Sequence, residues 1–180
     1  MRLSARPRGY LLDLHELAVQ YDLPFVLHVY ESKVQRVSEQ LVSGRSLVRF
    51  VRDLGVLDRR ACIVHAVWID EEDVADLASS GATVVHSPSG NLRCGSGQLP
   101  YRPLLDAGVP IALCTDEATV EDTNNLWNVG RLAALLHKNA GPDYRKWPTA
   151  PEILDALTAG GASRDGAEGS GRNARGRCPC

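Results

Sequence analysis

The segments Pro24–His28 (PFVLH), Ala61–His65 (ACIVH), Ala82–His86 (ATVVH) and Pro110–Asp116 (PIALCTD) decide the fold. Each is a short apolar run that leads to a histidine or a carboxylate, and helix-like segments separate the four runs. Parallel strands that alternate with helices direct their last residues to one shared edge of the sheet. Four ligand-type side chains at successive strand ends therefore favour the catalytic face of a (β/α)8 barrel.

The chain has 180 residues, whereas a complete barrel of this type needs about 250. We therefore predict an α/β fold that forms part of a TIM-type barrel. A formal net charge of -2 and a pI near 6.2 argue against nucleic acid and acidic membrane surfaces as partners. The sequence has no apolar run of membrane-spanning length and no signal-peptide core, which favours a cytoplasmic location.

Helical periodicity predicts the other elements. Helices are expected at Tyr10–Tyr21, Leu47–Leu54, Asp70–Gly81, Pro103–Ala107 and Asn124–His137, with a last one that reaches Leu157. The polar stretch Glu31–Gly44 is interpreted as a long loop. We divide the chain into a partial barrel at residues 1–158 and a disordered tail at 159–180, because this Gly, Arg and Ser mixture has too few apolar side chains to fold.

Three strand-end positions carry the candidate chemistry. His28 and Glu31, in the string HVYES, offer a metal-binding nitrogen and a proton-transfer carboxylate near the same strand end. Asp116 follows an apolar run, where a buried carboxylate is costly unless it is paired or bound to metal. The alternatives are a surface or core role for the histidine and a helix-capping or turn role for Asp116. With His65 after the second run, we favour a joint site.

The quoted motifs resemble a known family. The strings HVYE, VHAVWIDEEDVADLASSGATVVHSPSGNLRCGSG, PLLDAGVPIALCTDEA and NNLWNVGRLAALLHK are similar to the second half of the catalytic barrel of the amidohydrolase superfamily. Within it, they most resemble the branch of nucleobase and S-adenosylhomocysteine-type deaminases and triazine chlorohydrolases. The resemblance covers about residues 10–157 and assigns the four runs to strands five to eight.

The resemblance implies a metal-dependent hydrolase that acts on C–N or C–Cl bonds of a nitrogen heterocycle. It makes His28 and Asp116 ligands of a divalent metal, zinc or iron, and Asp116 also the acceptor of a proton from water. Glu31 would carry that proton to the ring or leaving group. His65 would stabilise the reacting oxygen or bind the metal. The implied substrate-binding residues are His86, Asn91 and Glu117, although His86 and Asn91 also suit a simple turn.

The sequence departs from the family pattern in three ways. It contains no His-x-His pair, which supplies two further metal ligands on the first strand of the family's barrel. Glu117 stands where glycine usually follows the aspartate, and Gly90 where serine is common. Strands one to four are not expected in this chain either. We thus expect a fragment that is inactive alone and whose cut edges make it a homo-oligomer, or that needs a separate amino-terminal half.

Three alternatives remain open at this point. In the first, the chain is one half of a two-chain enzyme. In the second, it is a non-catalytic half-barrel that serves as a binding or scaffold protein. In the third, it is a metal-free enzyme in which Glu31 and Asp116 act as an acid/base pair.

Overall fold

The computed structural model describes residues 5–117, 119–120 and 124–161. Its four strands are β1 (Phe25–Val29), β2 (Ala61–His65), β3 (Thr83–His86) and β4 (Ile111–Leu113). They form one parallel sheet in the order β1-β2-β3-β4. The prediction of four parallel strands joined by helices, as in part of a barrel, is confirmed.

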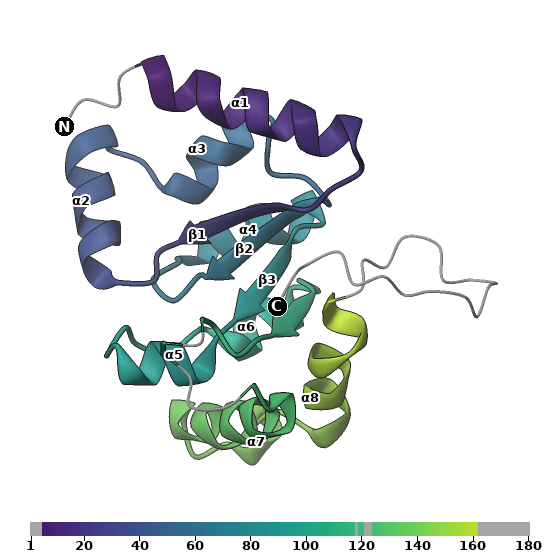
Figure 1. Ribbon diagram of the computed structural model, residues 1–180. Helices are drawn as coiled ribbons and strands as arrows, with labels where there is room; N and C mark the ends of the chain where they lie inside the picture. Colours follow the sequence, from purple (N-terminus) through teal and green to yellow (C-terminus); the bar gives the residue numbers. More distant parts are fainter. Residues whose placement is uncertain (1–4, 118, 121–123, 162–180) are drawn as a thin grey trace.

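Helices connect and cover the strands (Figure 1). Helix α1 packs on β1, whereas α7 and α8 pack on each other and on β4. The α-helices are α1 (Ala5–Gln20), α2 (Lys33–Ser43), α3 (Leu47–Asp53), α4 (Glu71–Ser80), α5 (Pro88–Arg93), α6 (Tyr101–Asp106), α7 (Leu126–Leu136) and α8 (Ala150–Leu157). Three short 3-10 helices follow α7 or α8, namely η1 (His137–Ala140), η2 (Tyr144–Lys146) and η3 (Ala159–Gly161).

The two faces of the sheet bury different clusters. Alternate strand residues, among them Ile63, Val84 and Ile111, belong to the large core under the helices. The intervening positions form a small second cluster made of Cys62, Val64, Val85, Ala112 and Cys114. This alternation follows from the period of two along a strand. The second cluster is the side of the sheet that would line the interior of a closed barrel.

The helix boundaries follow local capping chemistry. In α4, the Asp70 side chain accepts from the backbone N–H of Asp73 and forms a capping box with it, and Gly81 ends the helix at a φ of 73°, as glycine readily does. The prediction of a long loop at Glu31–Gly44 is wrong, because this stretch contains α2. Ser32 caps its start and Gly44, at a φ of 69°, ends it.

Both edges of the sheet lack a neighbouring strand within the described residues. β1 pairs only with β2, and β4 only with β3. Val26 on β1 is 40 % exposed, although the next strand of a barrel would cover it. None of the helices in the described ranges combines the length and apolar character needed to cross a bilayer. The predicted tail lies almost entirely outside the described residues.

Candidate active site

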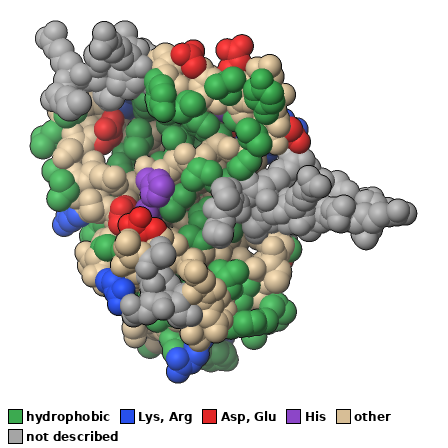
Figure 2. Space-filling model, in the orientation of Figure 1, with side chains coloured by type: hydrophobic (Ala, Val, Ile, Leu, Met, Phe, Trp, Pro, Cys, Tyr) green, Lys and Arg blue, Asp and Glu red, His purple; other side chains and the backbone are tan. Residues whose placement is uncertain are grey.

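A cavity of about 560 Å³ opens at the carboxyl ends of the strands. Its lining is Val26, His28, Glu31, Cys62, Val64, His65, Val85, Ser87, Cys94, Cys114, Asp116, Glu117 and Val120. Figure 2 shows a histidine beside acidic side chains near the middle of this face, bordered by apolar side chains. Its volume lies in the range of small-molecule sites. Its lining of mostly apolar side chains with a few polar groups is also typical of such sites.

Glu31 and His65 form the polar centre of this cavity. The Oε2 atom of Glu31 lies 3.7 Å from Nε2 of His65, whose side chain is 3 % exposed. The rings of His28 and His65 have centroids 5.3 Å apart. The structure therefore brings together three residues that the sequence places at two different strand ends. The carboxylate and the imidazole lie just beyond direct hydrogen-bond distance, a separation that one bridging water would span.

Left-handed backbone conformations accompany the site residues. Tyr30 (φ 52°), His65 (φ 72°), Ala66 (φ 47°) and Asp116 (φ 67°) are four of the five non-glycine residues with positive φ in the described chain. Strict alternation would place His65 on the helix-covered face with Ile63, yet its side chain lines the cavity. Backbone strain of this kind persists where function requires it, and here it accompanies the inward position of His65.

Asp116 follows β4, at the opposite edge of the sheet from Glu31 but at the same carboxyl ends of the strands. Its Oδ1 accepts from the backbone N–H of Glu117 at 2.9 Å, and both residues line the cavity. The carboxylate also lies directly against Gly90, where a Cβ atom would collide with Oδ2 and fall 3.0 Å from Cγ. The glycine at position 90 is thus required by the observed orientation of Asp116.

Two predicted substrate contacts, Asn91 and His86, lie behind the cavity wall. Both side chains are completely buried, and neither is among the lining residues. Asn91 Oδ1 lies 2.9 Å from His65 Nδ1. His86 occupies an outward position of β3, and its Nε2 lies 3.0 Å from Nε2 of His137. The four strand-end residues thus share one end of the sheet, but the ring of His86 lies on the other face.

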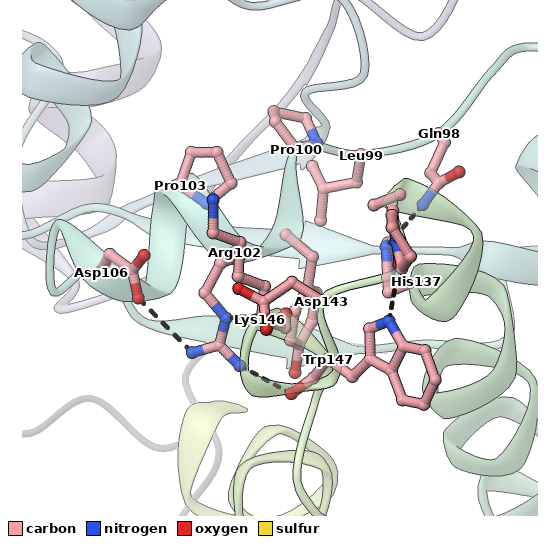
Figure 3. Close-up of a pocket in the computed structure, with 14 residues that line it drawn as sticks. Gln98, Leu99, Pro100, Arg102, Pro103, Asp106, His137, Asp143, Lys146 and Trp147 are labelled. Atoms are coloured by element: carbon pink, nitrogen blue, oxygen red, sulfur yellow. Dashed lines mark hydrogen bonds and ion pairs between the residues drawn. The ribbon is translucent and has the colours of Figure 1, made fainter.

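His137, on the outer side, belongs to a second cavity of about 580 Å³, which is lined by residues of the segments 98–106 and 137–147 (Figure 3). Gln98 Nε2 donates to His137 Nδ1 at 3.2 Å. Burial lowers the pKa of His137 to about 4. Burial and the neighbouring histidines also hold the pKa of His86 well below its usual value. The pair is therefore uncharged near neutral pH.

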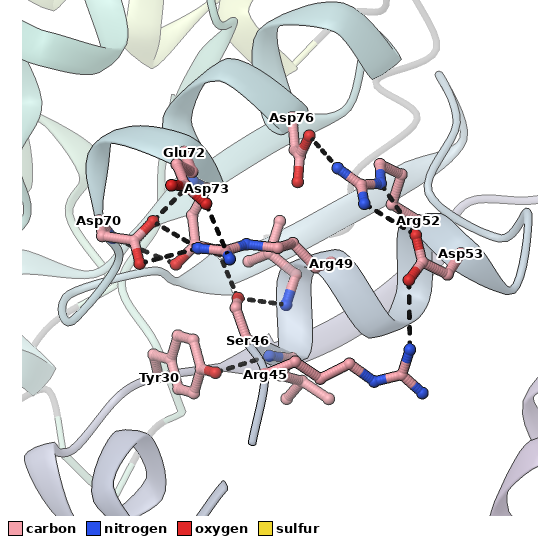
Figure 4. Close-up of polar contacts among 12 residues, drawn as sticks. Tyr30, Arg45, Ser46, Arg49, Arg52, Asp53, Asp70, Glu72, Asp73 and Asp76 are labelled. Atoms are coloured by element: carbon pink, nitrogen blue, oxygen red, sulfur yellow. Dashed lines mark hydrogen bonds and ion pairs between the residues drawn. The ribbon is translucent and has the colours of Figure 1, made fainter. Parts of the chain in front are cut away.

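A polar network holds Tyr30, which precedes Glu31 in the chain, and joins the neighbouring helices; Figure 4 shows the part of it around Tyr30, Ser46 and Asp73. The Tyr30 hydroxyl accepts the backbone N–H of Leu47 at 2.6 Å. Arg36 of α2 pairs with Asp70 and with the fully buried Asp73, the latter at 2.9 Å. Burial raises the pKa of Asp73, although hydrogen bonds and Arg36 oppose that effect. These contacts join α2 to α4 and so fix the start of α2 beside the cavity.

The described residues contain no preformed group of metal ligands. In residues 5–117, 119–120 and 124–161, no three histidine, cysteine or carboxylate side chains group closely enough to hold one ion. A catalytic zinc takes three protein ligands and keeps one open position. His28, His65 and Asp116 share the cavity without forming such a group, so their role as ligands stays a prediction.

Proteins of known sequence match most of the chain. The model of the amidohydrolase family matches residues 7–166. The 5-methylthioadenosine/S-adenosylhomocysteine deaminase of Pyrococcus furiosus is 37% identical over 123 residues, which are 68% of this chain and 29% of that protein. The enzyme of the same name from Nitratidesulfovibrio vulgaris is 34% identical over 163 residues, 91% of this chain and 37% of its own length. The chain thus spans about a third of these relatives.

Solved structures of related enzymes also match most of this chain and about a third of their own length. An adenosine deaminase from Xanthomonas campestris with bound zinc superposes with a TM-score of 0.81 at 29% identity, over 87% of this chain and 35% of that one. An atrazine chlorohydrolase from Arthrobacter aurescens complexed with zinc also gives 0.81, at 30% identity, over 87% and 34%. With the match over residues 7–166 and a parallel half-barrel whose strand ends carry His28, Glu31, His65 and Asp116, the chain belongs to the amidohydrolase family.

Proposed function

We propose that this chain supplies the carboxyl-terminal half of the active site of a hydrolase that removes an amino or chloro substituent from a nitrogen heterocycle. The observation that carries the proposal is the cavity at the strand ends. Glu31, His65 and Asp116 line it together with apolar side chains of the strands. An apolar floor suits a flat ring, and the polar groups at the rim suit a reaction at its edge. The names of the relatives, deaminases and a chlorohydrolase, point to the same chemistry.

The reaction that these residues would support is a hydrolytic substitution. Water adds to the ring carbon as its C–O bond forms, and the C–N or C–Cl bond then breaks to release ammonia or chloride. Asp116 accepts a proton from the water, and Glu31 delivers a proton to the ring nitrogen or to the departing amine. His65, whose Nε2 lies 3.7 Å from Glu31 Oε2, would hold the attacking water by accepting a hydrogen bond from it, or would bind the metal. Glu117 lies on the cavity wall and would contact the substituents of the ring.

A divalent metal, zinc or iron, would belong to the complete site and would make water nucleophilic at neutral pH. His28 and Asp116, with His65 as a third donor, are the residues of this chain that we propose as its ligands. Because the described residues contain no ready group of three, we propose that strands of an amino-terminal half-barrel supply the remaining donors. The proposed steps for this chain therefore concern its own side chains and not the metal.

We further propose that the sheet is completed by an amino-terminal half-barrel or, failing that, by a second copy of the chain. The free edges of β1 and β4 support this, since unpaired strand edges recruit further strands and closure removes them. A half-barrel that binds heterocycles without turnover is the second candidate, and the cavity of about 560 Å³ that the chain forms by itself favours it.

Reconstitution tests the proposal. The chain is mixed with the amino-terminal half of a related deaminase, and ammonia release from amino-purines and chloride release from chlorotriazines are followed. We expect no turnover by the chain alone and turnover by the mixture. Glu31→Gln should lower the rate by about 100-fold or more, as loss of a general acid or base does. The matched control is His15→Gln on α1, where His15 contacts Asp58 at 3.1 Å away from the cavity.

Two results would contradict the proposal. Turnover by the chain alone, as a monomer, would show that the site is complete without other strands. Equal rates for Glu31→Gln and His15→Gln in the reconstituted enzyme would show that Glu31 transfers no proton. Binding of a heterocycle without turnover in any mixture would favour the second candidate.

A further inference from the structure

Asn91 stands out as a buried polar side chain in direct contact with a site residue. It belongs to α5, has no exposed surface and presents its carboxamide to the back of the His65 ring. Its Oδ1 lies 2.9 Å from Nδ1 of His65. Its Nδ2 is buried and has no hydrogen-bond partner within the described part of the chain. Asn91 therefore touches His65 and does not reach the cavity.

We propose that Asn91 is a positioning residue that fixes the tautomer of His65. An amide oxygen can only accept a hydrogen bond, so the ring nitrogen that faces it must carry the proton. With the proton on Nδ1, the neutral ring has a free lone pair on Nε2. That nitrogen is the one that lies 3.7 Å from Glu31 Oε2, so its lone pair is available on the cavity side.

The backbone of Asn91 is held on both sides, which makes it a rigid support. Its N–H donates to the carbonyl of Ser87 at 3.0 Å, and its carbonyl accepts from the N–H of Ser96 at 2.8 Å. Partners that hold an imidazole from behind determine which of its nitrogens is available in front. The unpaired buried Nδ2 is an unfavourable feature that is readily understood if the oxygen of the same side chain is needed at His65.

The opposite orientation of the amide defines the alternative. If Asn91 presented Nδ2 to His65, it would donate to Nδ1, and the ring would carry its proton on Nε2. The lone pair on the cavity side would then be lost. The two orientations thus give His65 opposite chemical roles. This inference deepens the proposed function, on which its catalytic meaning rests, but the tautomer itself is a property of the folded chain alone.

Nitrogen-15 NMR of the imidazole rings, at a pH where His65 is neutral, tests the proposal. The His65 signals are assigned by their loss in His65→Gln. We expect the wild-type chain to show protonated Nδ1 and unprotonated Nε2. Asn91→Leu, of similar size but without an acceptor, should move His65 toward a mixture of tautomers or to the Nε2-protonated form. Asn91→Asp keeps an acceptor oxygen and should leave Nδ1 protonated.

The wild-type spectrum alone can overturn the proposal, even if Asn91→Leu fails to fold. An Nε2-protonated His65 in the wild-type chain would show that the amide has the opposite orientation. An unchanged tautomer in a folded Asn91→Leu variant would show that Asn91 does not determine it. Neither readout depends on turnover or on metal. An inactive reconstituted enzyme with Nδ1-protonated His65 would contradict the proposed function and leave the role of Asn91 intact.

Discussion

Acidification below neutral pH should destabilise the fold through His137. This side chain is 3 % exposed, and its two ring nitrogens contact His86 and Gln98, while Tyr101 stacks on its ring at 4.6 Å. No carboxylate is among these contacts to stabilise a positive charge. Burial accordingly lowers the pKa of His137 from the ordinary histidine value of 6.5 to about 4.

The size of the effect follows from linkage. The unfolded chain binds a proton at this histidine below about pH 6.5, whereas the folded chain does so only below about 4. The unfolded state therefore binds more protons in this window, and stability falls as the pH falls through it. The difference between 6.5 and 4, at about 1.36 kcal/mol for each pH unit, corresponds to about 3 kcal/mol. His86 acts in the same direction.

Urea unfolding followed by tryptophan fluorescence at pH values from 4 to 7.5 measures this slope. His137→Phe, which keeps a ring against Tyr101, should lower stability at pH 7.5 and make its pH dependence shallower. His28→Gln removes an exposed histidine and should preserve the slope. An equal slope in wild type and His137→Phe would refute the reasoning, because it would assign the acid sensitivity to other groups.

Three further predictions concern other parts of the chain. Zinc should dissociate from the isolated chain during dialysis against a chelator, and zinc that is retained would mean that this half holds more ligands than His28, His65 and Asp116. Gly130→Ala should cost about 1–3 kcal/mol, because its Cβ would lie 2.6 Å from Leu157 Cδ1, whereas Gly9→Ala, with open space around it, should not destabilise the chain in the same unfolding assay. The Arg102 hydrogen bonds lower the pKa of Glu152 to about 2, so Glu152→Gln should flatten the loss of stability between pH 4.5 and 2, and an unchanged acid limb would contradict this.

The strands were predictable because each is a short, continuous apolar run that ends at a polar residue. Runs of this length next to proline or glycine are too short for a buried helix and favour a strand. Helix α2 was missed for a physical reason. Its apolar residues Val34, Val37 and Leu41 recur at the spacing i, i+3, i+7 of an amphipathic helix, but they are few in number and set among polar residues. They are exposed in the structure, so no packing against the core accompanies this weak pattern. The signals that indicate the helix were Ser32 and Gly44 at its two ends.

The candidate site was only partly predictable. The order of the motifs identified His28, Glu31, His65 and Asp116 as strand-end residues, and all four line the cavity. Sequence alone did not reveal that His86 faces outward, because both faces of the strand Thr83–His86 are buried and its pattern gives no sign of which face is inner. It also did not reveal the left-handed backbone at His65, which accompanies the departure of that side chain from the alternation of its strand.

The left-handed backbone at Tyr30, His65, Ala66 and Asp116 leaves a trace that selection experiments should detect. Glycine adopts such a conformation without steric cost, so a library of variants selected only for folding should tolerate glycine at Ala66 and Asp116. It should reject glycine at Tyr30, because that side chain is buried and its hydroxyl holds the backbone of Leu47. A library selected for chemistry in the reconstituted enzyme should reject glycine at His65 and Asp116, yet still accept it at Ala66. A position where glycine is accepted in the first library and rejected in the second carries a side chain that the reaction needs and that the stability of the fold does not.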